Sequence, residues 1–183
     1  PEGTWAFLAE AIKSRVTVPV IAVGRFRTPS VAEEVLTQGR ADMVAIGRQL
    51  IADPYWPEKA TTGRTEDIIP CIGCNVCFET GLGGLGLKCS VNAASGKETE
   101  LTLLPALKPK KVMVVGGGPA GMEVARVVAQ RKHEVTLYER QIQLGGQLQV
   151  AAVPPYKHEL ESLNGYLTRQ LEKNAVKVKL GVE

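Results

Sequence analysis

The stretch VMVVGGGPAGMEVARVVAQRKHEVTLYER, residues 112–140, joins a short apolar run, a glycine-rich turn, a longer helical pattern and a second apolar run. Gly116, Gly118 and Gly121 have the spacing G-x-G-x-x-G, and Glu139 stands eighteen residues after Gly121. Such a turn lets a pyrophosphate approach a helix N-terminus, while an acid at the end of the next strand accepts hydrogen bonds from ribose hydroxyls. The stretch therefore predicts an α/β dinucleotide-binding unit. The alternative is a glycine turn that only packs a helix on a sheet.

The same pattern continues toward the C-terminus. The predicted elements are strands at 111–115 and 134–139, a helix at 119–131, a helix around 157–173 and a strand at 176–180. Between them, LGGQL (144–148) offers a second glycine loop. Its residues Gly145, Gly146 and Gln147 are candidates to contact the adenosine or flavin side of the ligand.

Two earlier segments, VPVIAVGR (18–25) and ADMVAIGR (41–48), are apolar runs that both end in Gly-Arg. Continuous apolar runs between turn residues are typical of parallel strands buried on both faces. Thr28 and Pro29 predict the start of a helix between them, and Gly39 predicts its end. A further helix precedes the first strand, with an apolar face formed by Trp5, Leu8, Ala9 and Ile12. Because two parallel strands do not make a free-standing domain, we expect them to be the tail of a larger barrel or sheet.

The two Gly-Arg turns suggest an anion site. If the strands are the last two of a (β/α)8 barrel, their carboxyl ends form a phosphate site, as the loops after strands seven and eight commonly do. Gly24 and Gly47 would present backbone N–H groups, while Arg25 and Arg48 would supply bidentate positive charge. The alternative is that both arginines are surface charges beside turn glycines.

Four cysteines form a metal-binding pattern. Cys71, Cys74 and Cys77 are spaced C-x2-C-x2-C, and eleven residues separate Cys77 from Cys89. Two-residue gaps direct successive thiolates to one centre, an arrangement of iron–sulfur clusters whose last ligand comes from elsewhere. Either [4Fe–4S] or [2Fe–2S] fits, and the tight triple spacing favours [4Fe–4S]. Zinc is the alternative, although its four-thiolate sites usually come as two paired C-x2-C units. Disulfides are disfavoured, because cysteines separated by two residues bridge poorly on a helix.

Composition excludes several classes of protein. The 183 residues are 44% hydrophobic and 22% charged, and a net charge of +3 without a basic run argues against nucleic acid as a partner. No stretch approaches the ~20 apolar residues of a membrane span, and the opening PEGTWAFLAE is not a secretory signal. We therefore expect a cytoplasmic protein without membrane contact. Because the chain opens with Pro1, we expect that it begins elsewhere than at a natural start.

The motifs AVGRF, AIGRQLIADP, CIGCNVC and GGGPAGMEVA occur here in that order. This series resembles the iron–sulfur branch of the Old Yellow Enzyme (NADH:flavin oxidoreductase) family, which includes trimethylamine and histamine dehydrogenases and 2,4-dienoyl-CoA reductase. The resemblance covers essentially the whole chain. It implies an α/β protein with four parts: the end of an FMN-binding (β/α)8 barrel (1–60), an iron–sulfur segment (61–100), a linker (101–110), and the first part of a glutathione-reductase-like domain for FAD or ADP (111–183).

The resemblance also implies the binding residues. It assigns the FMN phosphate to Gly24, Arg25, Gly47 and Arg48, and a [4Fe–4S] cluster to Cys71, Cys74, Cys77 and Cys89. It assigns the adenine dinucleotide to Gly116, Gly118, Pro119, Ala120, Gly121, Glu139, Arg140, Gly146 and Gln147, with Lys157 as a further basic contact. The strands that carry the family's substrate-side acids and the second nucleotide-binding half lie outside this sequence. No catalytic residue is therefore implied, and we expect a fragment that is inactive alone.

The implied enzyme passes single electrons through the cluster, between two-electron chemistry at FMN and a donor or acceptor elsewhere. The spacing of CIGCNVC resembles the amine dehydrogenases, which oxidise an amine and pass electrons to an electron-transfer flavoprotein, and this is the activity we expect. The alternative is an NAD(P)H-dependent dienoyl-CoA or enoate reductase, which the gap between Cys77 and Cys89 resembles. A non-catalytic electron-transfer or flavin-binding module is the alternative from another class. A homo-oligomer is left open.

Overall fold

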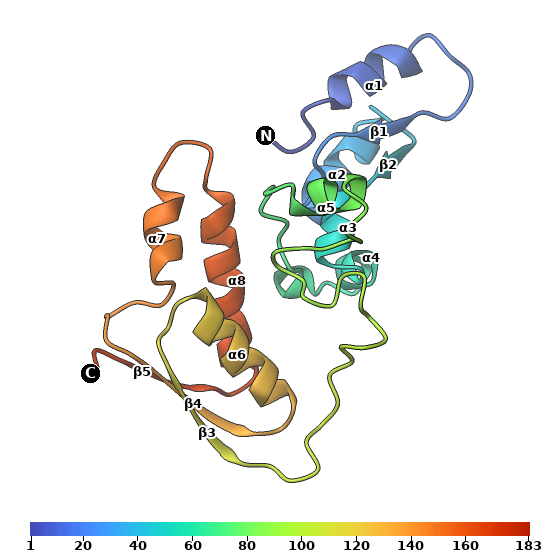
Figure 1. The fold of residues 1–183 in the computed structure, drawn as a ribbon. Coiled ribbons are helices and arrows are strands. Elements are labelled where there is room, and N and C mark those ends of the chain that lie inside the picture. Colours follow the sequence, from blue (N-terminus) through green and yellow to red (C-terminus); the bar gives the residue numbers. More distant parts are fainter. The chain divides into compact units, whose positions relative to one another are not determined.

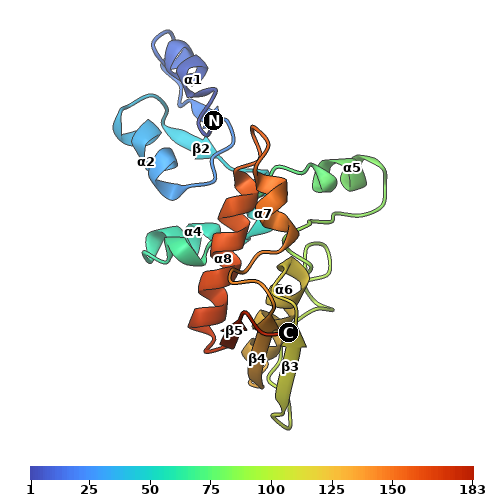
Figure 2. The same cartoon turned by 90° about the vertical axis from the view of Figure 1, so that its left-hand side faces the viewer.

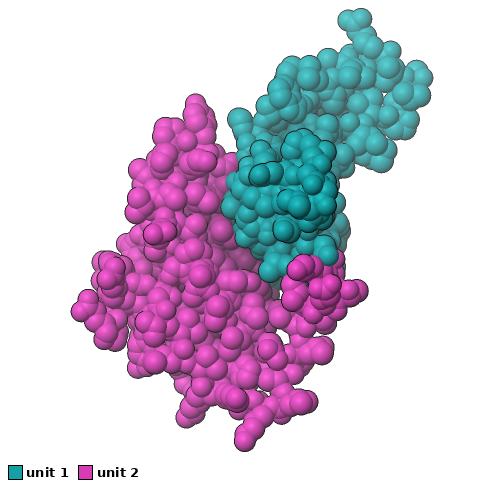
Figure 3. All heavy atoms as spheres, in the orientation of Figure 1, with its two compact units in different colours: residues 1–96 teal, residues 97–183 magenta.

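The computed structural model describes residues 1–183, and the chain divides into two compact units, residues 1–96 and residues 97–183 (Figure 3). Both units are α/β, as the sequence predicts. None of the helices combines the length and apolar character that a bilayer-crossing segment requires.

The first unit contains two short parallel strands and several helices (Figure 1). In chain order its elements are α1 (Ala6–Lys13), β1 (Ile21–Val23), α2 (Pro29–Thr37), β2 (Met43–Ala45), α3 (Arg48–Ala52), α4 (Trp56–Thr61), the 3-10 helix η1 (Thr65–Asp67) and α5 (Val76–Leu82). The predicted helix–strand–helix–strand order is confirmed, but the strands are shorter than the apolar runs that encode them.

The bounds of α2 follow from its capping residues. Thr28 is the N-cap and Pro29 the first helical residue, as expected, because proline lacks the N–H that a first turn leaves unpaired. Gly39 follows the C-cap with a φ of +68°, a conformation that glycine adopts without steric cost. The Thr28 hydroxyl, however, donates to Glu2 Oε1 at 3.0 Å and caps no helical N–H. The cap residue thereby ties α2 to the N-terminal turn.

Small side chains build the core of the first unit. The buried hydrophobic cluster consists of Ala6, Ala9, Ala22, Phe26, Ala32, Val35, Ala41, Trp56 and Ile68. Within this chain Ile21 and Val23 are 54% and 62% exposed, while Ala22 between them is buried. Burial of both strand faces in a larger barrel remains a prediction. Helices α1 and α2 pack on the sheet, and no element of the unit covers the opposite face of β1.

The second unit is a parallel sheet of three strands in the order β3-β4-β5. Its elements are β3 (Lys111–Val115), α6 (Pro119–Gln130), β4 (Glu134–Glu139), α7 (Gln147–Ala152), α8 (Glu159–Lys173) and β5 (Lys177–Leu180). These bounds agree with the predicted ones within two residues, and α7 is additional. Helices α6 and α8 pack against each other on the same side of the sheet (Figures 1 and 2).

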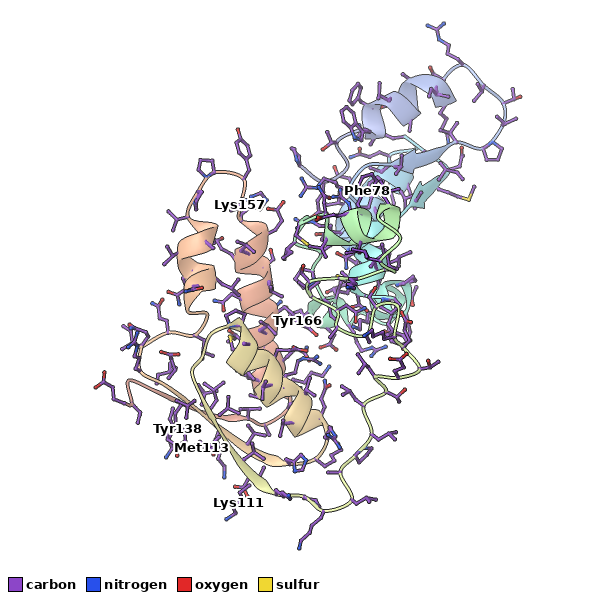
Figure 4. The ribbon with its side chains drawn as sticks, in the orientation of Figure 1. Phe78, Lys111, Met113, Tyr138, Lys157 and Tyr166 are labelled. Carbon is purple, nitrogen blue, oxygen red and sulfur yellow. The ribbon has the colours of Figure 1, made fainter.

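Alternation along the strands decides which side chains meet the helices. Val135 and Leu137 of β4 are buried at 2% and 0% exposure, because they face α6 and α8. Met113 and Tyr138 belong to the opposite face of the sheet and point away from these helices (Figure 4). The sheet therefore buries one face inside the unit.

The third glycine of the glycine-rich turn is required by the packing of α6 on β3. A Cβ atom on Gly121 would lie 1.9 Å from the Gly116 carbonyl oxygen, a backbone atom that cannot move independently. A Cβ on Gly118 would meet no atom within 4 Å, and its φ of −75° suits any residue. The two glycines therefore have different structural roles.

We predict that Gly121→Ala destabilises the chain by roughly 1–3 kcal/mol, since the added methyl group forces α6 away from β3. The matched variant Gly118→Ala should change the free energy of unfolding by no more than about 0.5 kcal/mol. Urea unfolding followed by circular dichroism measures both. Equal stability of the two variants would contradict this account of the helix–strand contact.

Candidate functional site

A pocket of about 270 Å³ in the first unit joins the two Gly-Arg turns to the cysteine segment. Three arginines line it, Arg25, Arg27 and Arg48, and no carboxylate does. Its other lining residues are Val23, Phe26, Ala45, Gly47, Gln49, Cys71, Gly73 and Phe78. Phe78 lies on α5 (Figure 4). A concave site with several cations and an apolar wall favours an anionic ligand that carries a ring system or similar apolar part.

The two Gly-Arg turns, which follow β1 and β2, differ in backbone conformation and in the space around them. Arg25 has a φ of +56°, which is uncommon for a residue with a Cβ and is found mostly where the surroundings enforce it. A Cβ on Gly47 would meet no atom within 4 Å, so the space above this turn is open. The structure thus brings three of the four predicted phosphate residues, Arg25, Gly47 and Arg48, to one pocket.

Gly24 does not line the pocket. A Cβ at this position would lie 3.0 Å from the backbone nitrogen of Trp5, and the Gly24 carbonyl accepts the Gly3 N–H at 2.8 Å. Close approach of the N-terminal turn therefore explains this glycine without a ligand. Its predicted contact with a phosphate remains a prediction.

The four cysteines are all free thiols, with Cys74 exposed and the other three partly buried. Burial raises the pKa of the Cys89 thiol, and the proximity of Cys71 and Cys74 raises it further, while hydrogen bonds from the Val91 and Asn92 backbone amides oppose this rise. Three of the thiols are thus close enough to interact electrostatically. No group of three or more His, Cys, Asp or Glu side chains converges closely enough to form a metal site.

The backbone around the cysteines nevertheless fits a cluster. Gly73 and Asn75 have φ values of +66° and +62°, and left-handed residues between ligands let a short loop turn its thiols to one side. Backbone amides that donate to a cysteine sulfur, as at Cys89, are a feature that tunes iron–sulfur clusters. Four thiolates suit an iron–sulfur cluster and zinc alike, so the donor set leaves both open.

Direct contacts connect the cysteine segment to the pocket arginines. The Arg48 guanidinium donates to Asn75 Oδ1, between Cys74 and Cys77. An anion that engages Arg48 would therefore compete with, or share, a contact to the cysteine loop. Occupancy of the pocket and the conformation of this loop are linked.

Asp53 is a buried residue that motif analysis passed over. It is 1% exposed, and its carboxylate accepts from Lys59 Nζ at 2.6 Å, from the Ile69 N–H at 2.9 Å and from the Tyr55 N–H at 3.1 Å. Its position four residues after Gln49 was a usable signal, because residues at i and i+4 share one face of a helix. Gln49 and Asp53 are both polar, and the three residues between them in the sequence are apolar.

The glycine-rich turn of the second unit has the geometry of an anion site. Gly116 adopts a φ of +102°, and Gly118 is the N-cap of α6. No side chain caps α6, and its first turn carries no acidic residue. Pro119 and Ala120 open the helix, with Ala120 exposed. The positive end of the helix dipole is therefore available to a negatively charged group.

Glu139 holds the turn in place. Its carboxylate accepts the Gln141 N–H at 2.8 Å and the Gly117 N–H, so it connects the end of β4 to the glycine turn. These backbone hydrogen bonds lower the pKa of Glu139 from its ordinary value of 4.5. The carboxylate lies beside the turn, as predicted, and its expected bond to a ribose remains a prediction.

The second glycine loop packs on the first. The Gly145 N–H donates to the Gly117 carbonyl at 2.8 Å, and a Cβ on Gly146 would lie 3.2 Å from Gly118 Cα. Gln147, the first residue of α7, follows this contact and is exposed. The structure thus brings the LGGQ loop to the glycine-rich turn.

Two further residues are predicted to contact the dinucleotide, Arg140 and Lys157. Arg140 is exposed immediately after β4, next to Glu139. Lys157 lies before the end of α8 that is remote from the strands, whereas the glycine turn follows β3 (Figure 4). The predicted contact of Lys157 with the dinucleotide remains a prediction.

Comparison with known proteins matches two families to different parts of the chain. Residues 3–67 match the NADH:flavin oxidoreductase / NADH oxidase family. Residues 86–183, more than half of the chain, match the pyridine nucleotide-disulphide oxidoreductase family. The chain belongs to the flavin-dependent oxidoreductases that combine these two domains. The family resemblance inferred from the four motifs is confirmed.

Two curated relatives are similar over nearly the whole chain. A metal reductase of Desulforamulus reducens is 46% identical over 91% of the chain and 25% of the relative. An NADH oxidase of Thermoanaerobacter brockii is 45% identical over 99% of the chain and 28% of the relative. The chain therefore spans about a quarter of the length of the curated relatives it matches.

Two solved structures superpose on the entire chain. A 2-naphthoyl-CoA reductase complex gives a TM-score of 0.95 at 36% identity and is matched over 28% of its length. Histamine dehydrogenase from Rhizobium sp. 4-9 gives a TM-score of 0.92 at 32% identity and is matched over 27%. Reductases and amine dehydrogenases thus share this portion of the fold.

We predict that Glu139→Gln destabilises the chain only where the carboxylate is ionised. A pKa lowered by folding stabilises the protein above the ordinary value of 4.5, and this stabilisation is lost as the pH falls through the lower folded-state pKa. The difference in urea midpoint between wild type and variant should be present at about pH 7 and should shrink as the pH falls below 4.5.

The control is Glu172→Gln, at an exposed position on α8. It should leave the midpoint close to that of the wild type at both pH values. If the urea midpoint of the wild type exceeded that of Glu139→Gln by a larger margin as the pH fell, this would contradict the proposed role of the carboxylate.

Proposed function

We propose that this chain provides the FMN-phosphate site, the cluster ligands and the first part of the adenine-dinucleotide site of an iron–sulfur flavoprotein oxidoreductase. The observation that carries the proposal is the pocket in the first unit, where three arginines and Cys71 share one cavity. An anion site directly beside a cysteine-rich loop would hold a flavin and a cluster in the same region of the protein, and electron exchange between them requires such proximity.

The FMN phosphate is bound by Arg25 and Arg48 through charged hydrogen bonds and by the backbone at Gly47, with Gly24 as a further backbone contact. The three pocket arginines and the open space at Gly47 support this assignment. Guanidinium groups present two parallel donors, which suit a phosphate better than a single ammonium group does. The end of a (β/α)8 barrel, residues 1–60, is the architecture we propose for this part.

Cys71, Cys74, Cys77 and Cys89 hold a [4Fe–4S] cluster in the segment 61–100. The left-handed residues between the ligands and the amide donors at Cys89 support the assignment. When bound, the two groups supply two-electron chemistry at the flavin and one-electron transfer at the cluster. The protein's own contribution is to hold the thiolates and to fix their distance from the phosphate site.

The adenine dinucleotide, FAD or ADP, is bound at residues 111–183, after the linker 101–110. Its pyrophosphate lies at the start of α6, where Gly116, Gly118, Pro119, Ala120 and Gly121 form the turn. Glu139 accepts from the ribose, and Arg140, Gly146 and Gln147 complete the site. The uncapped N-terminus of α6 and the packing of the second glycine loop on the first support this part. Lys157 is the weakest member of the set, because it lies near the remote end of α8.

For the whole enzyme we propose oxidation of an amine, with electrons leaving to an electron-transfer flavoprotein. The C-x2-C-x2-C spacing and the likeness to histamine dehydrogenase favour it. The second candidate is an NAD(P)H-dependent reductase of enoyl compounds, favoured by the similarity to an NADH oxidase and to 2-naphthoyl-CoA reductase. The two candidates differ in what reduces the flavin, an amine in the first and NAD(P)H in the second.

We predict that Cys89→Ala in the full-length enzyme abolishes or cripples the cluster and spares FMN. The 183 residues contain no fifth cysteine that could replace Cys89. FMN should stay bound, because arginines and backbone groups hold its phosphate. Iron, acid-labile sulfide and flavin analysis of protein prepared without oxygen measures both effects.

The matched control is Ser90→Ala, which removes the hydroxyl 3.3 Å from Cys74 Sγ but no ligand. It should retain iron, sulfide and FMN at wild-type levels. A wild-type protein with stoichiometric zinc and no acid-labile sulfide would refute the iron–sulfur assignment.

A further inference from the structure

The segment that leads into the cysteine loop is held by side chains instead of by a neighbouring strand. Ile69 donates its N–H to Asp53 Oδ2 at 2.9 Å and accepts Gln49 Nε2 through its carbonyl at 2.8 Å. Cys71 donates its N–H to Gln49 Oε1 at 3.0 Å. Pro70 between them has no N–H to place. Residues 69–71 thus pair with one face of α3 much as a strand pairs with its neighbour.

Gln49 uses both ends of its amide in this contact. Gln49 is 3% exposed, so water does not readily replace the hydrogen-bond partner of either end of the amide. A planar carboxamide that donates to the carbonyl of Ile69 and accepts from the amide of Cys71 fixes the position and the tilt of this short segment. Gln49 also follows Arg48 directly in the chain, at the start of α3. The same helical turn therefore carries a pocket arginine and the side chain that is hydrogen-bonded to Cys71.

A second pocket side chain holds Cys71 from the other direction. Arg27 Nη1 donates to the Cys71 carbonyl at 3.1 Å. Glu2 orients this guanidinium through contacts of 3.0 Å to Nη2 and 3.2 Å to Nε. Arg27 lies two residues after Arg25, on the turn that follows β1. Both backbone groups of Cys71 are thus fixed by residues next to the two Gly-Arg turns.

We propose that Gln49 is a positioning residue that fixes Cys71, the first cluster ligand, relative to the flavin-phosphate turns. This inference rests on the proposed function. The rate of electron exchange depends on the distance and orientation between donor and acceptor, so a residue that fixes a cluster ligand also affects this rate. Arg48 and Gln49 are consecutive residues in the first turn of α3, and Gln49 is hydrogen-bonded to Cys71. This connection fixes the position of Cys71 relative to Arg48.

The test uses the full-length enzyme with its cofactors and three variants. Gln49→Leu removes both hydrogen bonds at similar volume. Gln49→Glu keeps the acceptor for the Cys71 N–H but replaces the donor with a second oxygen facing the Ile69 carbonyl. Gln38→Leu changes an exposed glutamine and is the matched control. The readouts are FMN and iron content, the EPR spectrum of the reduced cluster, and the rate of electron transfer from flavin to cluster in rapid mixing.

We expect Gln49→Leu and Gln49→Glu to bind FMN as the wild type does, with an altered EPR spectrum and a severalfold lower rate of electron transfer from flavin to cluster. If Gln49→Leu loses its cluster, the EPR spectrum and transfer rate of Gln49→Glu become the deciding measurements. A cluster-bearing Gln49→Glu protein with the spectrum and rate of Gln38→Leu overturns the inference. If the wild type itself lacks acid-labile sulfide, the proposed function fails and the inference fails with it. A normal wild-type cluster that neither Gln49 variant alters refutes the inference alone.

Discussion

Backbone N–H and C=O groups that lie outside helices and strands still need hydrogen-bond partners when they are removed from water. In the first unit this requirement falls on residues 69–71. It is met by two polar side chains four residues apart, Gln49 of α3 and Asp53 directly after that helix. Lys59 balances the buried charge of Asp53. The cysteine loop, the pocket and the Gly-Arg turns all depend on this small polar contact, because it joins them within a unit whose apolar core is built largely from alanine.

The second unit meets a comparable constraint through close backbone contact. The Gly116–Gly121 approach brings α6 onto β3, and the Gly145–Gly146 loop packs on the same turn with its own hydrogen bond to Gly117. Glu139 then links the turn to the end of β4. Each contact leaves the N-terminus of α6 uncapped and open. The residues that stabilise the fold here are also those that would surround a bound pyrophosphate, so stability and binding are coupled.

Sequence patterns predicted the second unit almost completely, because periodicity and a motif of three glycines act over short distances. They also predicted the pairing of Arg25 with Arg48, since parallel strands end at the same edge of a sheet. They did not predict Gln49, Asp53 and Arg27 as supports of Cys71, because those contacts join residues 16 to 44 positions apart with no spacing rule. Gly24 has a packing role that the motif did not indicate, because the N-terminal turn lies directly against it. Its contact with a phosphate remains a prediction. One face of β1 is exposed in this chain, because an apolar run indicates the character of a strand and not which element covers each face.

The side chains of Gln49 and Asp53 order the start of the cysteine loop whether or not a metal is bound. Amide hydrogen exchange in the metal-free chain, resolved at Ile69 and Cys71, tests this most directly, with Leu107 as a fully exposed reference. We predict that both amides exchange markedly more slowly than that of Leu107, because Asp53 and Gln49 accept their hydrogens in the absence of metal. Exchange of both amides at the rate of an unprotected peptide, with protection only after a cluster is assembled, would contradict the account.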